Sequence, residues 1–81
     1  MNSLIELLQL IRTGHETLIT EDGTEGLKNF QIRVLTIKEA FARKYIEEPE
    51  YQLNRKYGML QIFDQVSNLR LTILGNSYLD K

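Results

Sequence analysis

Several side chains in the second half of the sequence are of the types that bind nucleic acid. Gln52 can form two hydrogen bonds with adenine, and Arg55 can do the same with guanine. Both would face solvent, together with Tyr51, if residues 49–57 formed a helix with Leu53 turned inward, because each residue turns a helix by about 100°. Nearby lysines and arginines carry the charge that binds phosphates. The candidate nucleic-acid-binding residues are Lys38, Arg43, Lys44, Tyr51, Gln52, Arg55, Lys56 and Arg70.

The sequence gives weaker grounds for catalysis or metal binding. The single histidine, His15, follows Gly14, where an imidazole can interact with the last carbonyls of a helix. The carboxylates of Glu47, Glu48 and Glu50 are not accompanied by a base or nucleophile. The chain has no cysteine, so disulfides and thiolate metal sites are excluded. We therefore expect no catalytic residue, no metal site, no cofactor and no enzymatic activity.

The composition is that of an ordinary globular chain. Its 81 residues are 42% hydrophobic and 26% charged, which corresponds to one domain over residues 1–81. The net charge is −1, but residues 28–57 carry +3 and residues 1–27 carry −4. No apolar run approaches the roughly 20 residues that span a bilayer, and the N-terminus lacks the pattern of a signal peptide. We expect a cytoplasmic protein without a membrane partner.

The elements that would position these side chains begin with a helix over residues 3–13. Leucines and isoleucines recur there at intervals of three and four residues, which is the period of an amphipathic helix. Gly14 is a suitable residue to end it, because glycine readily adopts the left-handed conformation that follows many helices.

The segment after this helix has two interpretations. Alternating apolar and polar residues favour a short strand at about 31–35, which could pair with residues 17–20 in a hairpin. Phe30, Val34 and the apolar residues around them also fit the stripe of a continuous helix from Glu25 into the forties. The sequence leaves both interpretations open.

Two helices are expected in the middle of the chain. Thr36 and Glu39 have the spacing of a capping box, in which each side chain bonds a free main-chain N–H, so a helix is predicted over 37–47. Pro49 suits the first position of a further helix over 49–57, since its missing N–H would be unpaired there.

The last third predicts two strands. Gly58 ends the preceding helix, and strand-like runs follow at 59–66 and 69–74. Ser67-Asn68 is a suitable turn between them, because asparagine tolerates left-handed geometry. Gly75 is then expected to end the second strand.

The order of these elements resembles the winged helix-turn-helix family. Residues 35–42 resemble the start of that family's second helix, and residues 53–62 resemble its junction of helix, glycine and strand. Residues 71–79 resemble its leucine-threonine, glycine and tyrosine-leucine ending. The resemblance covers residues 31–79 well and residues 3–13 loosely. It implies an α+β fold with three main helices and a C-terminal β-hairpin wing.

This resemblance implies a small DNA-binding protein, a transcriptional regulator that binds double-stranded DNA as a homodimer. The helix at 49–57 would then enter the major groove. Glu47, Glu48 and Glu50 depart from the pattern, because three carboxylates there would repel phosphate. The alternative is a protein-interaction module on the same fold without direct DNA binding. A third interpretation is a mixed α/β domain with two hairpins and no role with DNA.

The helix at 3–13 has more apolar surface than one buried face requires. One interpretation is that the helix is buried in the core on all sides. The other is that Ile5 and Leu10 extend beyond the core and form a dimer contact.

Overall fold

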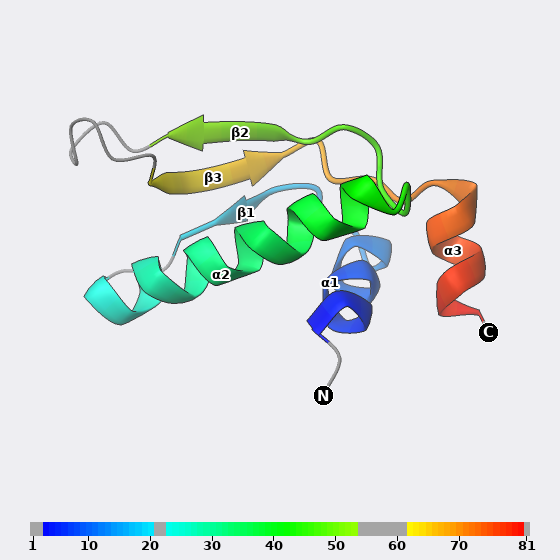
Figure 1. The fold of residues 1–81 in the computed structure, drawn as a ribbon, viewed down its shortest axis with the longest axis horizontal. Helices are drawn as coiled ribbons and strands as arrows, with labels where there is room; N and C mark the ends of the chain where they lie inside the picture. Colours follow the sequence, from blue (N-terminus) through cyan, green and yellow to red (C-terminus); the bar gives the residue numbers. More distant parts are fainter. Residues whose placement is uncertain (1–2, 21–22, 54–61, 81) are drawn as a thin grey trace.

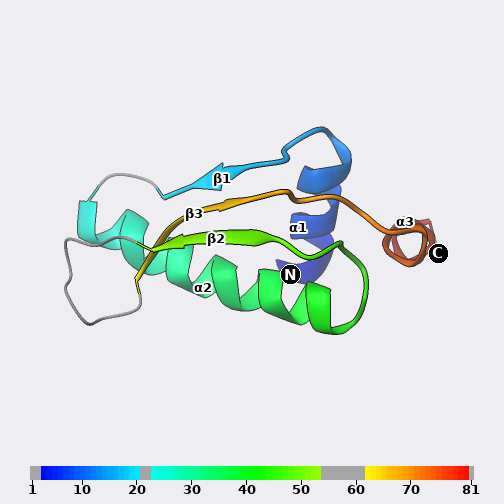
Figure 2. The same ribbon diagram turned by 90° about the horizontal axis from the view of Figure 1, so that it is seen from above.

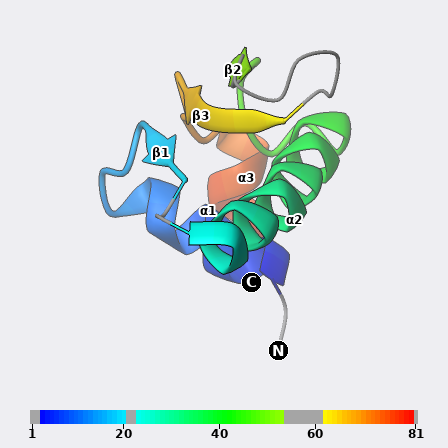
Figure 3. The same ribbon diagram turned by 90° about the vertical axis from the view of Figure 1, so that its left-hand side faces the viewer.

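A computed structural model describes residues 3–20, 23–53 and 62–80. Along the chain the elements are α1 (Ser3–Arg12), β1 (Leu18–Ile19), α2 (Gly23–Ala42), β2 (Glu50–Leu53), β3 (Phe63–Ser67) and α3 (Ile73–Leu79). The strands form one antiparallel sheet in the order β1-β3-β2, and α1 and α2 lie on one of its faces (Figure 1, Figure 3). The predicted α+β class is confirmed.

The first helix agrees with the prediction for residues 3–13. Its apolar stripe is buried, and the helix ends at Gly14, which has a φ of 110°. The Gly14 N–H donates to the Ile11 carbonyl at 3.0 Å, and the His15 N–H donates to the Leu10 carbonyl at 3.4 Å. These two bonds satisfy carbonyls that the helix leaves free at its end. The predicted role of Gly14 is confirmed.

The second helix, α2, is continuous over 20 residues. The predicted strand at 31–35 is wrong, and so is a helix start at residue 37, because Thr36 lies inside α2 instead of capping it. The alternative of one helix from Glu25 into the forties is confirmed. Buried side chains recur at helical spacing along α2. A strand would bury Ile32 on the same face as Phe30 and Val34, but Ile32 is 55% exposed.

The predicted helix at 49–57 is also wrong where the structure describes it. Residues 50–53 form β2, while the rest of that segment lies outside the described residues. The side chain of Tyr51 is half-buried and that of Gln52 is exposed, which is the two-residue alternation of a strand. Pairing with β3, the next strand along the chain, decides the conformation here.

The strand predicted at 59–66 is confirmed for residues 63–66, and residues 59–61 lie outside the described part of the chain. The second strand, predicted at 69–74, is wrong. Only Leu71 pairs there, in a single bridge with Ile46, and α3 begins two residues later. The strands therefore do not form a C-terminal hairpin, and the predicted wing is absent from the described residues.

The sheet joins segments from both halves of the chain. β1 and β2 are both antiparallel to β3, so they run parallel to each other on its two sides. α2 connects them across one face of the sheet, which is a split β-α-β arrangement (Figure 2). The predicted pairing of residues 17–20 with 30–35 is wrong, because Leu18 lies opposite Val66. Because β3 pairs on both sides, β1 and β2 are the edge strands.

The short helix α3 packs against the residues that follow α2. The Thr72 hydroxyl donates to the Lys44 carbonyl at 2.6 Å and accepts the Gly75 N–H at 3.1 Å, so Thr72 caps α3. Gly75, predicted to end a strand, instead lies in α3 against the main chain of Tyr45. The ring of Tyr45 stacks on that of Tyr78 with centroids 4.6 Å apart.

The hydrophobic core lies where α1 and α2 meet the sheet. Its most deeply buried side chains include Leu8 of α1, Ile37 of α2, Val66 of β3 and Leu69, which follows β3. None of the described helices is long and apolar enough to cross a membrane.

Candidate binding groove between β1 and α2

The basic side chains of α2 do not gather on one face. Lys28, Arg33 and Lys38 are five residues apart, and five residues turn a helix by about 500°, or about 140° beyond a full turn. Successive bases therefore point in different directions around α2. Arg43, just beyond the helix, is ion-paired with Glu39 at 3.1 Å.

Of the predicted nucleic-acid-binding residues, Lys38 and Tyr51 are brought together. The Lys38 Nζ lies 5.7 Å from the centre of the Tyr51 ring and 5.0 Å from that of Phe63, a distance at which a cation is attracted to an aromatic face. Burial raises the pKa of the Tyr51 hydroxyl above its ordinary value. Tyr51 thus faces the helix layer, and Gln52 faces the opposite side of β2. The prediction that the two share one outward surface is wrong.

The other predicted residues lie apart from this pair. Lys44 follows α2 with a φ of 63°, and its N–H donates to the Phe41 carbonyl at 2.9 Å, as at a helix end. Arg70 is exposed in the segment between β3 and α3. Arg55 and Lys56 lie outside the described residues. The Lys44 carbonyl accepts the Thr72 hydroxyl and the Arg70 carbonyl accepts the Glu47 N–H, so Lys44 and Arg70 both lie where the segment after α2 meets the segment after β3.

Two further sets of predicted residues have defined places. The His15 Nδ1 lies 3.1 Å from the Leu10 carbonyl oxygen, which confirms the predicted contact with the end of the first helix. Ile5 and Leu10, the predicted dimer contact, are both half-buried. Within residues 3–20, 23–53 and 62–80, no three histidine or acidic side chains are grouped as a metal site requires.

One edge of the sheet is available for pairing at β1. The Thr20 N–H donates to the Asp64 carbonyl at 2.9 Å, and Leu18 lies opposite Val66. Main-chain groups of an antiparallel strand point alternately to its two sides. Because the main-chain N–H and C=O groups of Leu18 and Thr20 point towards β3, those of Ile19 point away from it. β1 therefore presents a main-chain donor and acceptor at the rim of the sheet.

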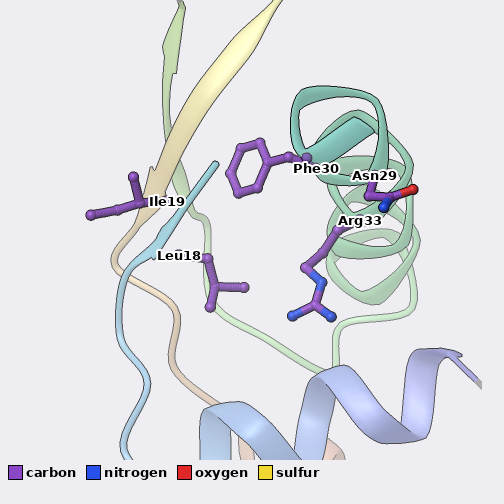
Figure 4. A pocket seen from close by; sticks show the side chains of 6 residues that line it. Leu18, Ile19, Asn29, Phe30 and Arg33 are labelled. Carbon is purple, nitrogen blue, oxygen red and sulfur yellow. The ribbon is translucent and has the colours of Figure 1, made fainter. Parts of the chain in front are cut away.

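A groove of about 360 Å³ lies beside this edge, between β1 and the first half of α2. Its lining residues are Leu18, Ile19, Gly26, Asn29, Phe30 and Arg33. Figure 4 shows the side chains of Leu18 and Phe30 projecting into the space between the two elements, while Ile19 points to the other side of β1. The groove therefore has two apolar side chains within a lining that also includes Asn29 and Arg33, and β1 forms one of its sides.

Arg33 supplies the charge of this groove. Its guanidinium lies opposite the Leu18 side chain, on the side of Phe30 that faces α1 (Figure 4). It makes no ion pair or side-chain hydrogen bond with any residue that the structure describes. Arg33 also lines a second pocket of about 210 Å³ between α1 and α2, which contains the carboxylate residue Glu6. No Glu6–Arg33 ion pair forms, so the guanidinium is available to a bound group.

Sequence reasoning did not identify this groove. Gly26, Asn29, Phe30 and Arg33 have the i, i+3, i+4, i+7 spacing of one helical face, so the helical interpretation of this segment contains the signal. The position of β1 opposite that face depends on its pairing with β3, more than 40 residues later. Comparison of the chain with protein-family models, with curated protein sequences and with solved structures finds no match.

Proposed function

We propose that this chain is a protein-binding module that accepts an extended polypeptide as an additional strand on the free edge of β1. The observation that carries the proposal is the direction of the Ile19 main chain, whose N–H and C=O point away from β3 beside the groove. An unpaired strand edge is a template for another extended chain. Main-chain hydrogen bonds then supply affinity, and pockets for alternate side chains supply specificity.

The groove gives the added strand a place for its side chains. Every second side chain of a strand points to the same face. On an added strand beside β1, those facing the helices would enter the space formed by Leu18 and Phe30. Complete burial of a leucine-sized side chain contributes about 1.5–3 kcal/mol, so partial burial in this open groove would contribute less than that to binding.

The expectation of DNA binding stays a prediction that rests on sequence resemblance. The helix proposed to enter the major groove is a strand at residues 50–53, and the bases of α2 point in different directions. A fluorescence titration with random duplex DNA at low salt tests it. DNA binding predicts an affinity that falls steeply with added salt and a loss on Arg43→Ala, whereas no binding at low salt would exclude it.

Two substitutions at Ile19 test the proposed strand addition. Proline lacks the N–H donor, and it is tolerated on an edge strand where that N–H faces solvent. Ile19→Pro should leave the β1–β3 pairing in place and remove the donor offered to a peptide. Ile19→Ala is the matched control, because it removes the side chain and keeps the donor.

The measurement is selection from a displayed library of random-sequence peptides on the immobilised chain, followed by fluorescence anisotropy with the enriched peptides. We expect Ile19→Ala to bind them within about threefold of the original chain and Ile19→Pro to bind at least about fivefold more weakly, since one main-chain hydrogen bond in a complex is worth about 1 kcal/mol or more. Equal binding by both variants, or no enriched peptide, would refute the proposal.

A further inference from the structure

We infer that the bound polypeptide ends in this groove and that Arg33 binds its C-terminal carboxylate. This inference rests on the proposed strand addition and adds the chemical group that the site recognises. It follows from three features: the guanidinium left without a partner among the described residues, its place at one end of the groove, and the helix that crosses that end.

The charge in the groove favours an anionic group. The guanidinium of Arg33, an exposed residue, lies in the same groove as the apolar side chains of Leu18 and Phe30. An arginine can bind a carboxylate through two parallel hydrogen bonds, and such charge-assisted bonds are about twice as strong as neutral ones.

The position of α1 favours the end of a chain over an internal acidic residue. Figure 2 shows β1 and α2 running side by side in opposite directions, with α1 lying across them near the start of β1 and the end of α2. Arg33 is the lining residue of α2 furthest along the helix towards α1, and its guanidinium points to that side (Figure 4). An extended chain that runs along β1 towards Arg33 meets α1 and must end or turn there.

The direction of the bound chain follows from the same geometry. β1 runs away from α1, from Leu18 to Ile19. A peptide whose C-terminus reaches Arg33 therefore runs antiparallel to β1, the pairing that β1 already makes with β3. Its last residues would place one apolar side chain between Leu18 and Phe30, so the preferred ligand is an extended peptide with an apolar residue near a free C-terminal carboxylate.

The test uses two pools of short random-sequence peptides, identical except that one ends in a free carboxylate and the other in an amide. Each pool is passed over the full chain, over Arg33→Ala and over Arg43→Ala, and retained peptides are counted by mass spectrometry. Arg43→Ala is the matched control, because that arginine is exposed and paired with Glu39 outside the groove. Circular dichroism of each variant verifies that it is folded.

We expect enrichment of free-acid peptides on the original chain and on Arg43→Ala, and a loss of about tenfold or more on amidation or on Arg33→Ala. Equal enrichment of both pools, unchanged by Arg33→Ala, would overturn the carboxylate inference and leave strand addition standing. Enrichment of neither pool on the original chain would overturn the proposed function itself, and the inference with it.

Discussion

At the scale of single residues, Gln31 completes the hydrogen bonding of a strand from outside the sheet. Its Nε2 donates to the Phe63 carbonyl at 2.6 Å, and its Oε1 accepts the Phe63 N–H at 2.9 Å. The register of β2 with β3 shifts at this point, between Gln52 and Leu53. The side-chain amide therefore binds both main-chain groups of Phe63 where its pairing with β2 is irregular, and it links the middle of α2 to the start of β3.

Replacement of Gln31 by leucine should lower the free energy of unfolding by about 2 kcal/mol, because it leaves a partly buried N–H and C=O without partners. Urea unfolding followed by circular dichroism measures this. Gln52→Leu is the control, since Gln52 is exposed and its main chain pairs normally. Equal effects of the two substitutions would show that the amide contacts contribute nothing.

Tyr51 makes stability depend on alkaline pH. Burial disfavours the phenolate in the folded chain, so the folded pKa is above its ordinary value of about 10. Such a group contributes its full stabilisation below the unfolded pKa, and the contribution falls as pH rises through the folded pKa. We expect the free energy of unfolding to decrease as the pH rises above about 10, the ordinary pKa of the group, and to decrease less in Tyr51→Phe. Parallel pH profiles of the two proteins would contradict this assignment.

At the scale of elements, local sequence signals predict α1, whereas pairing with β3 decides that the β1 and β2 segments are strands. α1 has an apolar stripe that matches the helical period and an ending at Gly14, so its bounds follow from neighbours in sequence. The segment 50–53 has Pro49 before it and apolar residues at helical spacing after it, and both favour a helix locally. Its strand conformation depends on β3, which the local pattern does not contain.

The segments of α2 and α3 contain apolar alternation that predicts strands, although both segments are helical. Apolar residues from Phe30 to Val34 fit both a two-residue and a helical period, and only the longer stripe through Ile37 and Ala40 separates them. Similarly, Leu71-Thr72-Ile73 alternates like a strand, yet Thr72 caps α3 through Gly75. A helix of seven residues is too short for its period to outweigh such alternation.

The attachment of α3 depends on the close approach of Gly75 to Tyr45. A Cβ placed on Gly75 would overlap the Tyr45 carbonyl oxygen, which is main chain and cannot rotate away. Gly75→Ala should therefore separate α3 from α2 and cost about 3 kcal/mol in the free energy of unfolding. Hydrogen exchange of the α3 amides measures the separation directly. Ser77→Ala, at an exposed position of the same helix, should leave exchange unchanged; protected α3 amides in Gly75→Ala would disprove the steric argument.

At the scale of the whole molecule, the groove requires all three of its surrounding elements. Arg33 and Phe30 come from α2, the free edge comes from β1, and α1 lies across the end. The sequence contains the helical face of this site, but the opposite wall exists only after β1 has paired with β3. This is why the candidate nucleic-acid-binding residues predicted from the sequence all follow Thr36, while the residues of the groove precede it.

Homodimer formation through α1 stays a prediction. Ile5 and Leu10 are half-buried, so each retains apolar surface that a second copy could cover. Sedimentation velocity over a range of concentrations should give a dimer that dissociates in Leu10→Gln, because a polar group at an apolar contact weakens association. Gln9→Glu, at an exposed position of the same helix, is the control. A monomer at every concentration would rule out the contact.

The stacked pair of Tyr45 and Tyr78 gives the protein an optical reporter of its own. The chain has no tryptophan, so tyrosine dominates its near-ultraviolet spectrum. Two rings with centroids 4.6 Å apart and planes inclined by 17° couple their electronic transitions, and the coupling ends when they part. Tyr51 lies instead beside Phe63 on the sheet. Near-ultraviolet circular dichroism can therefore follow the release of the C-terminal helix separately from the melting of the sheet, without a dye or an introduced chromophore.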